Sequence, residues 1–258
     1  MELFIMLLVV FLAVCVPASI VLSLTYINRN SKKILVKTLG FNSQIYLGCL
    51  GIIAHEFSHF IIAIFFGHQI KEAKFLILPS HVGSDGSLGY VNHGWDGRSL
   101  WQSLGNLFIG TAPVFGCTGV LYLIIKYMLQ GLFAAFTHFQ EALLAEQWTT
   151  LFSYPIALVQ TPKEWLIAFI AICLIANITI GGFDLSNADL NGSLPAFFTF
   201  YGLLAIICAT MYCIGLSNLV NSILLKGIII FSIVMSLSLI ISIVMNLLLR
   251  YLHFFVKL

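Results

Sequence analysis

Residues 47–67 read LGCLGIIAHEFSHFIIAIFFG, an apolar run with His55, Glu56 and His59 at its centre. The flanks, residues 47–54 and 60–67, carry no charged residue. A helix needs about 20 apolar residues to cross a bilayer. Inserting a charged side chain at that depth costs about 2.5–3.5 kcal/mol on insertion scales, so ionisable groups there indicate function. This stretch therefore predicts a membrane fold with a site inside it.

The composition of the whole chain supports the same class. Of its 258 residues, 60% are hydrophobic and only 9% are charged, whereas soluble domains carry about 25% charged residues. We therefore expect an all-α polytopic membrane protein that forms one integral membrane domain, residues 1–258, surrounded by a lipid bilayer. The net charge of +2 and the lack of a long basic run argue against a nucleic acid partner.

About six transmembrane helices are expected, each near the length that a bilayer requires. They are residues 3–26, 43–67, 104–128, 165–183, 195–216 and 227–249. The first run is longer than a signal-peptide core and lacks a basic start, so we read it as an uncleaved span. Residues 133–148 have mixed polarity and predict an amphipathic helix at the membrane interface.

Residues 28–37 hold Arg29, Lys32, Lys33 and Lys37, and they predict a cytoplasmic loop between the first two spans. If the spans alternate in direction, Lys126, Lys163 and Lys226 share that side. Arg250 and Lys257 then lie on the opposite side, together with the three basic residues within residues 71–98. This places seven of the twelve basic residues on the cytoplasmic side, which favours that orientation under the positive-inside rule.

A short membrane-associated β-hairpin is expected after the histidine-bearing helix. Residues 73–79 and 87–91 are strand-like runs joined by the turn-rich residues 80–86. Its edge could pair with an unwound substrate through main-chain hydrogen bonds, or it could be an ordinary hairpin outside the membrane. The nearby His68, His81 and His93 are candidate alternative ligands, but we expect solvated loop histidines, which are the commoner case.

The six cysteines stand singly in apolar runs, and no C-x-x-C pair is present. This pattern favours small buried side chains over disulfides or a thiolate metal site.

His55 and His59 lie four residues apart, so a helix presents both on one face, where they can bind one metal ion. Glu56 can act as general base towards a metal-bound water. A zinc site of this kind needs a third protein ligand. Our first candidate is Asp189, which comes just before a turn-like Asn-Gly pair, and our second is Asp184. Alternatively, both aspartates simply punctuate a loop between helices.

This set of motifs resembles the site-2 protease family of intramembrane zinc metalloproteases. The shared features are HExxH within a span, a following hairpin with Gly89-Tyr90-Val91, and a late Asp-x-x-Gly in another span. The resemblance implies that His55, His59 and Asp189 bind one Zn²⁺ and that Glu56 activates water. The usual family pattern has Asp directly before Gly and an Asn-Pro ahead of it, whereas two residues follow Asp189 here before Gly192. The likeness covers a catalytic core of residues 43–195, and the C-terminal spans, 195–249, add nothing specific.

We therefore expect an intramembrane zinc metalloprotease that hydrolyses a peptide bond in or near the transmembrane segment of a membrane-anchored protein. Asn106 could donate a hydrogen bond to the substrate or to the developing oxyanion, or it could join helices by packing. We expect a multi-pass protein of a bacterial cytoplasmic membrane. The alternative is a non-proteolytic membrane protein, either a metal-ion carrier or an inactive relative that binds a membrane partner.

Overall fold

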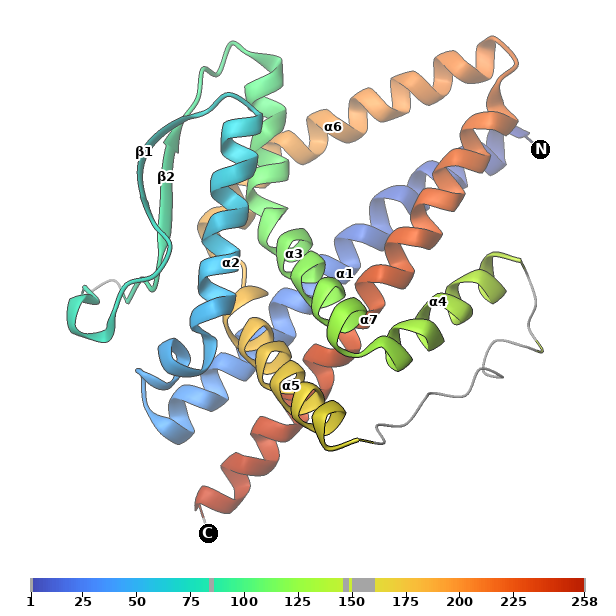
Figure 1. Ribbon diagram of the computed structural model, residues 1–258. Coiled ribbons are helices and arrows are strands. Elements are labelled where there is room, and N and C mark those ends of the chain that lie inside the picture. The colour runs from blue at the N-terminus through green and yellow to red at the C-terminus, as the bar shows by residue number, and fades with distance from the viewer. Residues whose placement is uncertain (1, 84–85, 146–148, 150–160, 258) are drawn as a thin grey trace.

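A computed structural model describes residues 2–83, 86–145, 149 and 161–257, and most of them are helical (Figure 1). Six helices are long and apolar enough to cross a membrane, which confirms the predicted fold class of an all-α polytopic membrane protein with a small β-hairpin. In chain order the elements are α1 (Glu2–Leu39), α2 (Ser43–Phe65), β1 (Gln69–Lys74), the 3-10 turn η1 (Pro79–His81), β2 (Tyr90–Gly94), α3 (Leu100–Met128), α4 (Gln130–Leu144), α5 (Pro162–Gly182), α6 (Asn187–Cys213) and α7 (Ser217–Lys257).

The first and last helices lie side by side and run in the same direction. Among the described residues, three pairs of polar side chains join the two helices. Residues later in α1 pair with residues later in α7, so the helices are parallel. These pairs are Asn28–Ser242 at 2.9 Å, Ser31–Asn246 at 2.8 Å and Thr38–His253 at 2.7 Å. Within an apolar medium such hydrogen bonds pair groups that would otherwise stay unsatisfied, so they fix the register of the two helices.

Helix α3 also runs parallel to α7, since Phe115 contacts Phe231 and Thr118 contacts Ser238. Helix α2 runs the opposite way. Its last residues pack on the first turns of α3, and Ser58 lies further along α3, at Gly116.

Helices α5 and α6 both run opposite to α1, although they follow one another in the chain. Along α5 and its end, Ile180 packs near Leu35 and Asp184 pairs with Arg29. Along α6, the hydroxyl of Tyr201 donates to the carbonyl of Ala13, nearer the start of α1. The chain therefore continues in one general direction through a break at residues 183–186, as Figure 1 shows.

This direction corrects two expectations about the topology. Residues 28–37 are not a loop, because they continue α1 to Leu39. The spans do not strictly alternate, so the end of α7 lies on the same side as the end of α1 (Figure 1). Eight of the twelve basic residues then gather towards that side: Arg29, Lys32, Lys33, Lys37, Lys126, Lys163, Arg250 and Lys257. Under the positive-inside rule this distribution favours that side as the cytoplasmic one more than the alternating arrangement does, and the orientation stays a prediction.

The hairpin forms closer to α2 than the sequence indicated. Gly67, with φ 74, ends the helix, and β1 begins two residues later. β1 pairs antiparallel with β2 from Gln69↔Gly94 to Lys74↔Tyr90, with an irregularity between Ile70 and Glu72. The predicted strands were placed too far towards the tip because β1 is polar and lacks the apolar alternation that marks a strand.

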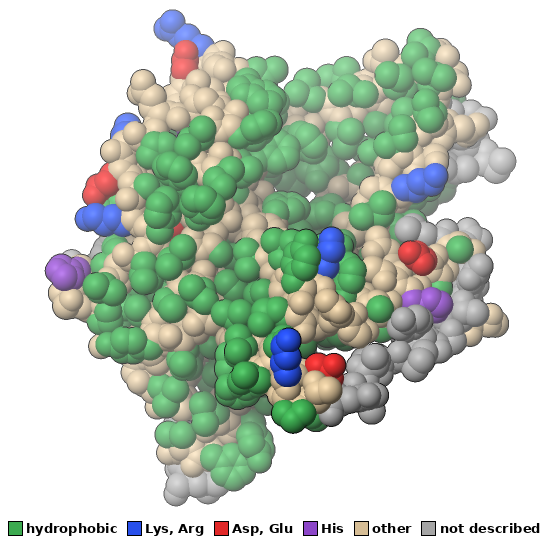
Figure 2. All heavy atoms as spheres, in the orientation of Figure 1, with side chains coloured by type: hydrophobic (Ala, Val, Ile, Leu, Met, Phe, Trp, Pro, Cys, Tyr) green, Lys and Arg blue, Asp and Glu red, His purple; other side chains and the backbone are tan. Residues whose placement is uncertain are grey.

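The core of the bundle lies between α1, α3, α5 and α7. Its fully buried side chains include Leu24, Val114, Leu121, Phe183 and Leu185. Outside it, hydrophobic side chains are spread over the whole face that Figure 2 shows, and many large ones are exposed. Apolar surface of this extent suits contact with lipid. All six cysteines are free thiols. Cys117 and Cys208 are buried as expected, whereas Cys173 and Cys213 are exposed, so the expectation of buried side chains is wrong for these two.

Helix α4 overlaps the predicted amphipathic helix of residues 133–148. Residues 146–148 of that prediction lie outside the described residues.

The arrangement of α5, α6 and α7 can be tested by labelling single cysteines in a cysteine-free variant with a membrane-impermeant maleimide. Phe41→Cys and Phe255→Cys, both exposed positions, should react from one side of the membrane. Ile214→Cys and Gly97→Cys, also exposed, should react from the other side. Reaction of Phe255→Cys together with Gly97→Cys would restore strict alternation and contradict this fold.

Candidate metal centre

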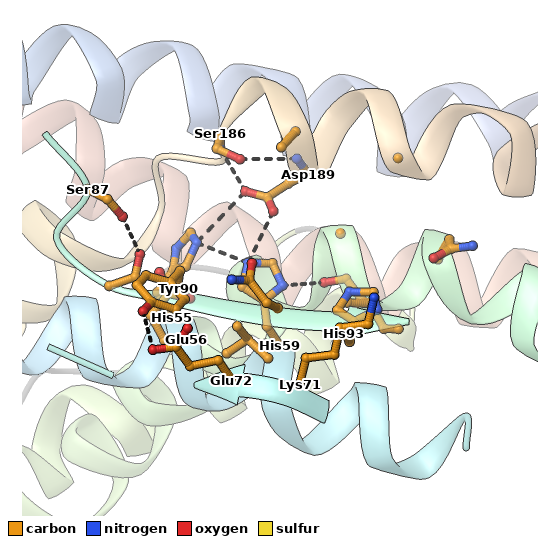
Figure 3. A pocket seen from close by; sticks show the side chains of 18 of the residues that line it. His55, Glu56, His59, Lys71, Glu72, Ser87, Tyr90, His93, Ser186 and Asp189 are labelled. Carbon is orange, nitrogen blue, oxygen red and sulfur yellow. Dashed lines mark hydrogen bonds and ion pairs between the residues drawn. The ribbon is translucent and has the colours of Figure 1, made fainter. Parts of the chain in front are cut away.

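Three side chains converge at the middle of the bundle (Figure 3). His55 and His59 project from one face of α2, with their Nε2 atoms 3.2 Å apart. Asp189, from the first turn of α6, places Oδ1 3.4 Å from Nε2 of His59 and Oδ2 4.0 Å from Nε2 of His55. The three ligand atoms lie within 4.8 Å of one another, and both histidines are buried.

The hydrogen bonds behind these side chains fix both imidazole tautomers. Nδ1 of His55 lies 2.9 Å from the carbonyl oxygen of Gly182, and Nδ1 of His59 lies 2.7 Å from that of Ile109. A carbonyl oxygen can only accept, so both Nδ1 atoms carry the proton. In the neutral rings both Nε2 atoms therefore present lone pairs to each other and to a carboxylate.

Two nitrogen lone pairs and a carboxylate that lie this close repel one another, and a cation between them would remove the repulsion. Metal-binding histidines commonly donate their other N–H to a carbonyl or carboxylate in this way, which orients the ring and raises its basicity. Two histidines and one carboxylate also match a catalytic zinc set, which leaves a fourth position for water or substrate. The residues present thus fit one Zn²⁺.

Local sequence explains why both carbonyl groups are available. Pro113 lies within α3 and has no N–H, so the carbonyl of Ile109, four residues earlier, lacks its usual helical partner. The carbonyl of Gly182 is free because α5 ends at that residue. Each histidine thus meets a carbonyl that the helix itself does not use.

Glycines bring α5 close enough to α2 for the first of these contacts. A Cβ atom on Gly51 would lie 2.7 Å from the carbonyl oxygens of both Asn177 and Ile178. A Cβ on Gly48 would lie 3.1 Å from the backbone of Gly181. Small residues of this kind allow close helix contact inside membranes.

Asp189 is held by the helix start on which it lies. Its Oδ2 accepts from the backbone N–H of Ser186 at 2.7 Å, and the hydroxyl of Ser186 accepts from the N–H of Asp189 at 3.1 Å. This reciprocal capping leaves Oδ1 directed at His59. Gly110 on α3 allows the first turns of α6 to approach α3, since a Cβ on Gly110 would collide with Ser193 and with the Asp189 carbonyl.

Asp184 has a different set of partners. It lies 3.2 Å from Nε of Arg29 and 3.4 Å from Nζ of Lys32, while Nη2 of Arg29 donates to the Leu185 carbonyl at 2.6 Å. This ion pair joins α1 to the break between α5 and α6. The geometry favours Asp189 over Asp184 as the third ligand, although not through the turn that we expected, because Asp189 and Gly192 are both helical.

Glu56 lies at the boundary of two cavities. One, of about 790 Å³, is lined by His55, His59, Asp189 and strand β2, and we name it the cleft. The other, of about 490 Å³, reaches Arg29 and Asp184. Gly89, just before β2, lies against Glu56, because a Cβ there would be 2.7 Å from Cγ of Glu56.

Asn106 also lines the cleft, so the structure brings it together with the other four predicted site residues. Its backbone carbonyl accepts from the hydroxyl of Ser193 at 3.4 Å. The role of its side chain stays a prediction.

Sequence reasoning missed the residues that orient the ligands, Gly182, Ile109 and Ser186. A signal existed for two of them. Ser186 stands three residues before Asp189, which is the spacing of a capping box. Pro113 stands four residues after Ile109, which marks a free carbonyl.

Comparison with protein-family models, with curated proteins and with solved structures returned no match. The resemblance to site-2 proteases therefore stays a prediction from the sequence motifs.

Replacing each aspartate by asparagine tests the ligand choice. Asp189→Asn keeps an oxygen that can accept from Ser186 but removes the charge, so zinc affinity should fall by more than about 100-fold, beyond the 10–100-fold seen when groups behind a ligand are lost. Asp184→Asn is the matched control and should retain about one zinc per chain. The measurement is zinc content by mass spectrometry after competition with a chelator. Greater loss of zinc from Asp184→Asn would move the third ligand to that residue.

Proposed function

We propose that this protein is an intramembrane zinc metalloprotease, which hydrolyses a peptide bond in or near the transmembrane segment of a membrane-anchored protein. One observation carries the proposal. His55, His59 and Asp189 converge beside Glu56 on the wall of a cavity within a bundle of membrane-type helices. This arrangement combines a metal-binding set, a carboxylate base and a space of about 790 Å³, which falls within the usual range of about 300–1,000 Å³ for ligand sites.

Zinc bound there would lower the pKa of a coordinated water towards about 7 and polarise the substrate carbonyl. Glu56 takes the proton of the attacking water and delivers it to the leaving amine. The oxygen of that water bonds to the carbonyl carbon, and the bond between that carbon and the amide nitrogen breaks. The second proton of the water also passes to the amine, so the products are a carboxylate and an ammonium group. Protons and charge therefore balance without a further reactant.

Strand β2 gives the cleft one wall that can hold an extended peptide. β1 pairs with one edge of β2, and residues 90–93 of β2 line the cleft. An unwound substrate could add to the free edge of β2 through main-chain hydrogen bonds. This favours the substrate-pairing role of the hairpin over the role of an ordinary surface hairpin.

The multi-pass membrane location follows from the six apolar helices. Its assignment to a bacterial cytoplasmic membrane remains part of the proposal, as does the identity of the membrane-anchored substrate.

Glu56→Gln tests the function most directly. The amide cannot accept the proton, so cleavage should fall by about 10²–10⁴-fold, the usual contribution of a general base, while zinc content stays near that of wild type. The measurement compares new peptide termini in membranes of cells that produce wild-type or Glu56→Gln protein. Equal cleavage by both would refute the assigned base. Zinc uptake into vesicles without any cleavage would favour a metal-ion carrier.

Gly89→Ala tests the contact between the hairpin and the base. The added methyl group would lie 2.7 Å from Cγ of Glu56 and 3.0 Å from the Lys74 carbonyl, so Glu56 must move. A displacement of about 1 Å near the chemistry can lower a rate about 100-fold. We expect a loss of kcat of that order with zinc retained. Gly97→Ala is the control, because nothing lies within 4 Å of its Cβ position, and it should cleave as wild type does.

A further inference from the structure

A second pair of histidines lies where the hairpin meets α2 and α3. His68 follows the positive-φ Gly67, and His93 lies in β2 on the wall of the cleft (Figure 3). Their Nδ1 atoms are 2.9 Å apart, and Nε2 of His68 lies 2.8 Å from the carbonyl oxygen of Gln102. His68 is only 6% exposed, so the expectation of a solvated loop histidine is wrong for it. His81, near the hairpin tip, is exposed as expected.

The two hydrogen bonds of His68 determine the tautomer of His93. The Gln102 carbonyl can only accept, so Nε2 of His68 carries a proton. In neutral His68 the other nitrogen, Nδ1, is then an acceptor. The 2.9 Å contact therefore requires that Nδ1 of His93 donates. The remaining nitrogen, Nε2 of His93, is left with a lone pair.

Packing holds His68 in this position. A Cβ on Gly105 would lie 3.0 Å from Nε2 of His68, so glycine is what allows the ring to approach α3. The ring of Trp95 stacks on His68 with centroids 6.0 Å apart and an interplanar angle of 20°. The side chain of Gln102 donates to the Gly67 carbonyl at 3.0 Å. These contacts therefore hold Nδ1 of His68, the acceptor for His93, in a fixed position between α2 and α3.

His93 is neutral under ordinary conditions. Burial, followed by the nearby His68 and His59, lowers the pKa of His93 from 6.5 to about 4, while Asp189 opposes the shift and Lys71 adds to it. At neutral pH the lone pair on Nε2 is therefore present. Within the part of the chain that the structure describes, this nitrogen has no hydrogen-bond partner.

We propose that Nε2 of His93 accepts a hydrogen bond from one backbone N–H of the peptide in the cleft, in a tautomer that His68 imposes. The inference rests on the proposed function, since the peptide is the substrate proposed above. A peptide N–H removed from water needs an acceptor, because leaving it unpaired is unfavourable. His93 lies on the cleft wall and offers an acceptor whose direction is fixed by His68 and which has no partner among the described residues. It is thus a substrate-contacting residue, with His68 as its positioning residue.

The test uses the zinc-loaded, full-length protein in detergent and acetyl-Leu-Leu-Leu-hydroxamate as the probe. Three further probes each carry one N-methyl group in place of one amide hydrogen. Methylation at one position should weaken binding to wild type by roughly 3- to 10-fold, the range of a single hydrogen bond. His93→Phe should bind the parent probe more weakly by a similar factor and should be insensitive to methylation at that position. His81→Gln is the matched control and should keep the wild-type pattern.

Two results would separate this inference from the proposed function. If methylation weakens binding equally in wild type and His93→Phe, the contact does not exist and only the inference falls. If zinc-loaded wild type does not bind the parent probe, the cleft is not a peptide site and the proposed function falls with it.

If His93→Phe folds poorly, NMR of the wild-type protein tests the tautomer of His93 directly. In protein labelled with ¹⁵N-histidine, His93 should show a protonated Nδ1 and an unprotonated Nε2 at pH 7. His68→Leu should remove this preference and give a mixture. The opposite tautomer in wild type would overturn the proposal.

Discussion

The central constraint of this structure is that two imidazole nitrogens and a carboxylate share one small space, in which neutral rings direct their lone pairs at each other. Nε2 of His55 and Nε2 of His59 are 3.2 Å apart, and both rings have committed their protons to carbonyl groups on the other side. Such an arrangement is repulsive by itself and becomes favourable with a divalent cation, whose charge also offsets that of Asp189. The packing of α2 against α3 and α5 brings the two histidines together with Asp189 from the start of α6.

The medium explains why the surrounding helices are irregular. In an apolar bundle every donor and acceptor needs a partner within the protein. Pro113 and the end of α5 each release a carbonyl, and the histidines of α2 use both. The break between α5 and α6 similarly exposes a helix start, where Ser186 and Asp189 cap each other. Each defect in the helical hydrogen bonding thus supplies one part of the site.

Charge pairing at the break connects the site to the frame of the bundle. Arg29 and Lys32 of α1 hold Asp184, and α1 is in turn joined to α7 by polar pairs in parallel register. The break is therefore anchored on one side by an ion pair and on the other by the contact of Gly110 with the start of α6. The hairpin then adds a wall whose Gly89 lies on Glu56 and whose His93 faces the cleft.

The sequence by itself determined the membrane class, the six apolar helices, and the pairing of His55 with His59 on one helix face. It could do so because hydropathy and the 3.6-residue period are local properties. It also indicated Asp189, although for a turn that does not form. Only the tertiary structure decided that Asp184 pairs with α1, that α5 and α6 run in the same direction, and that His68 orients His93. Those features depend on contacts between residues up to 188 positions apart, which no local pattern encodes.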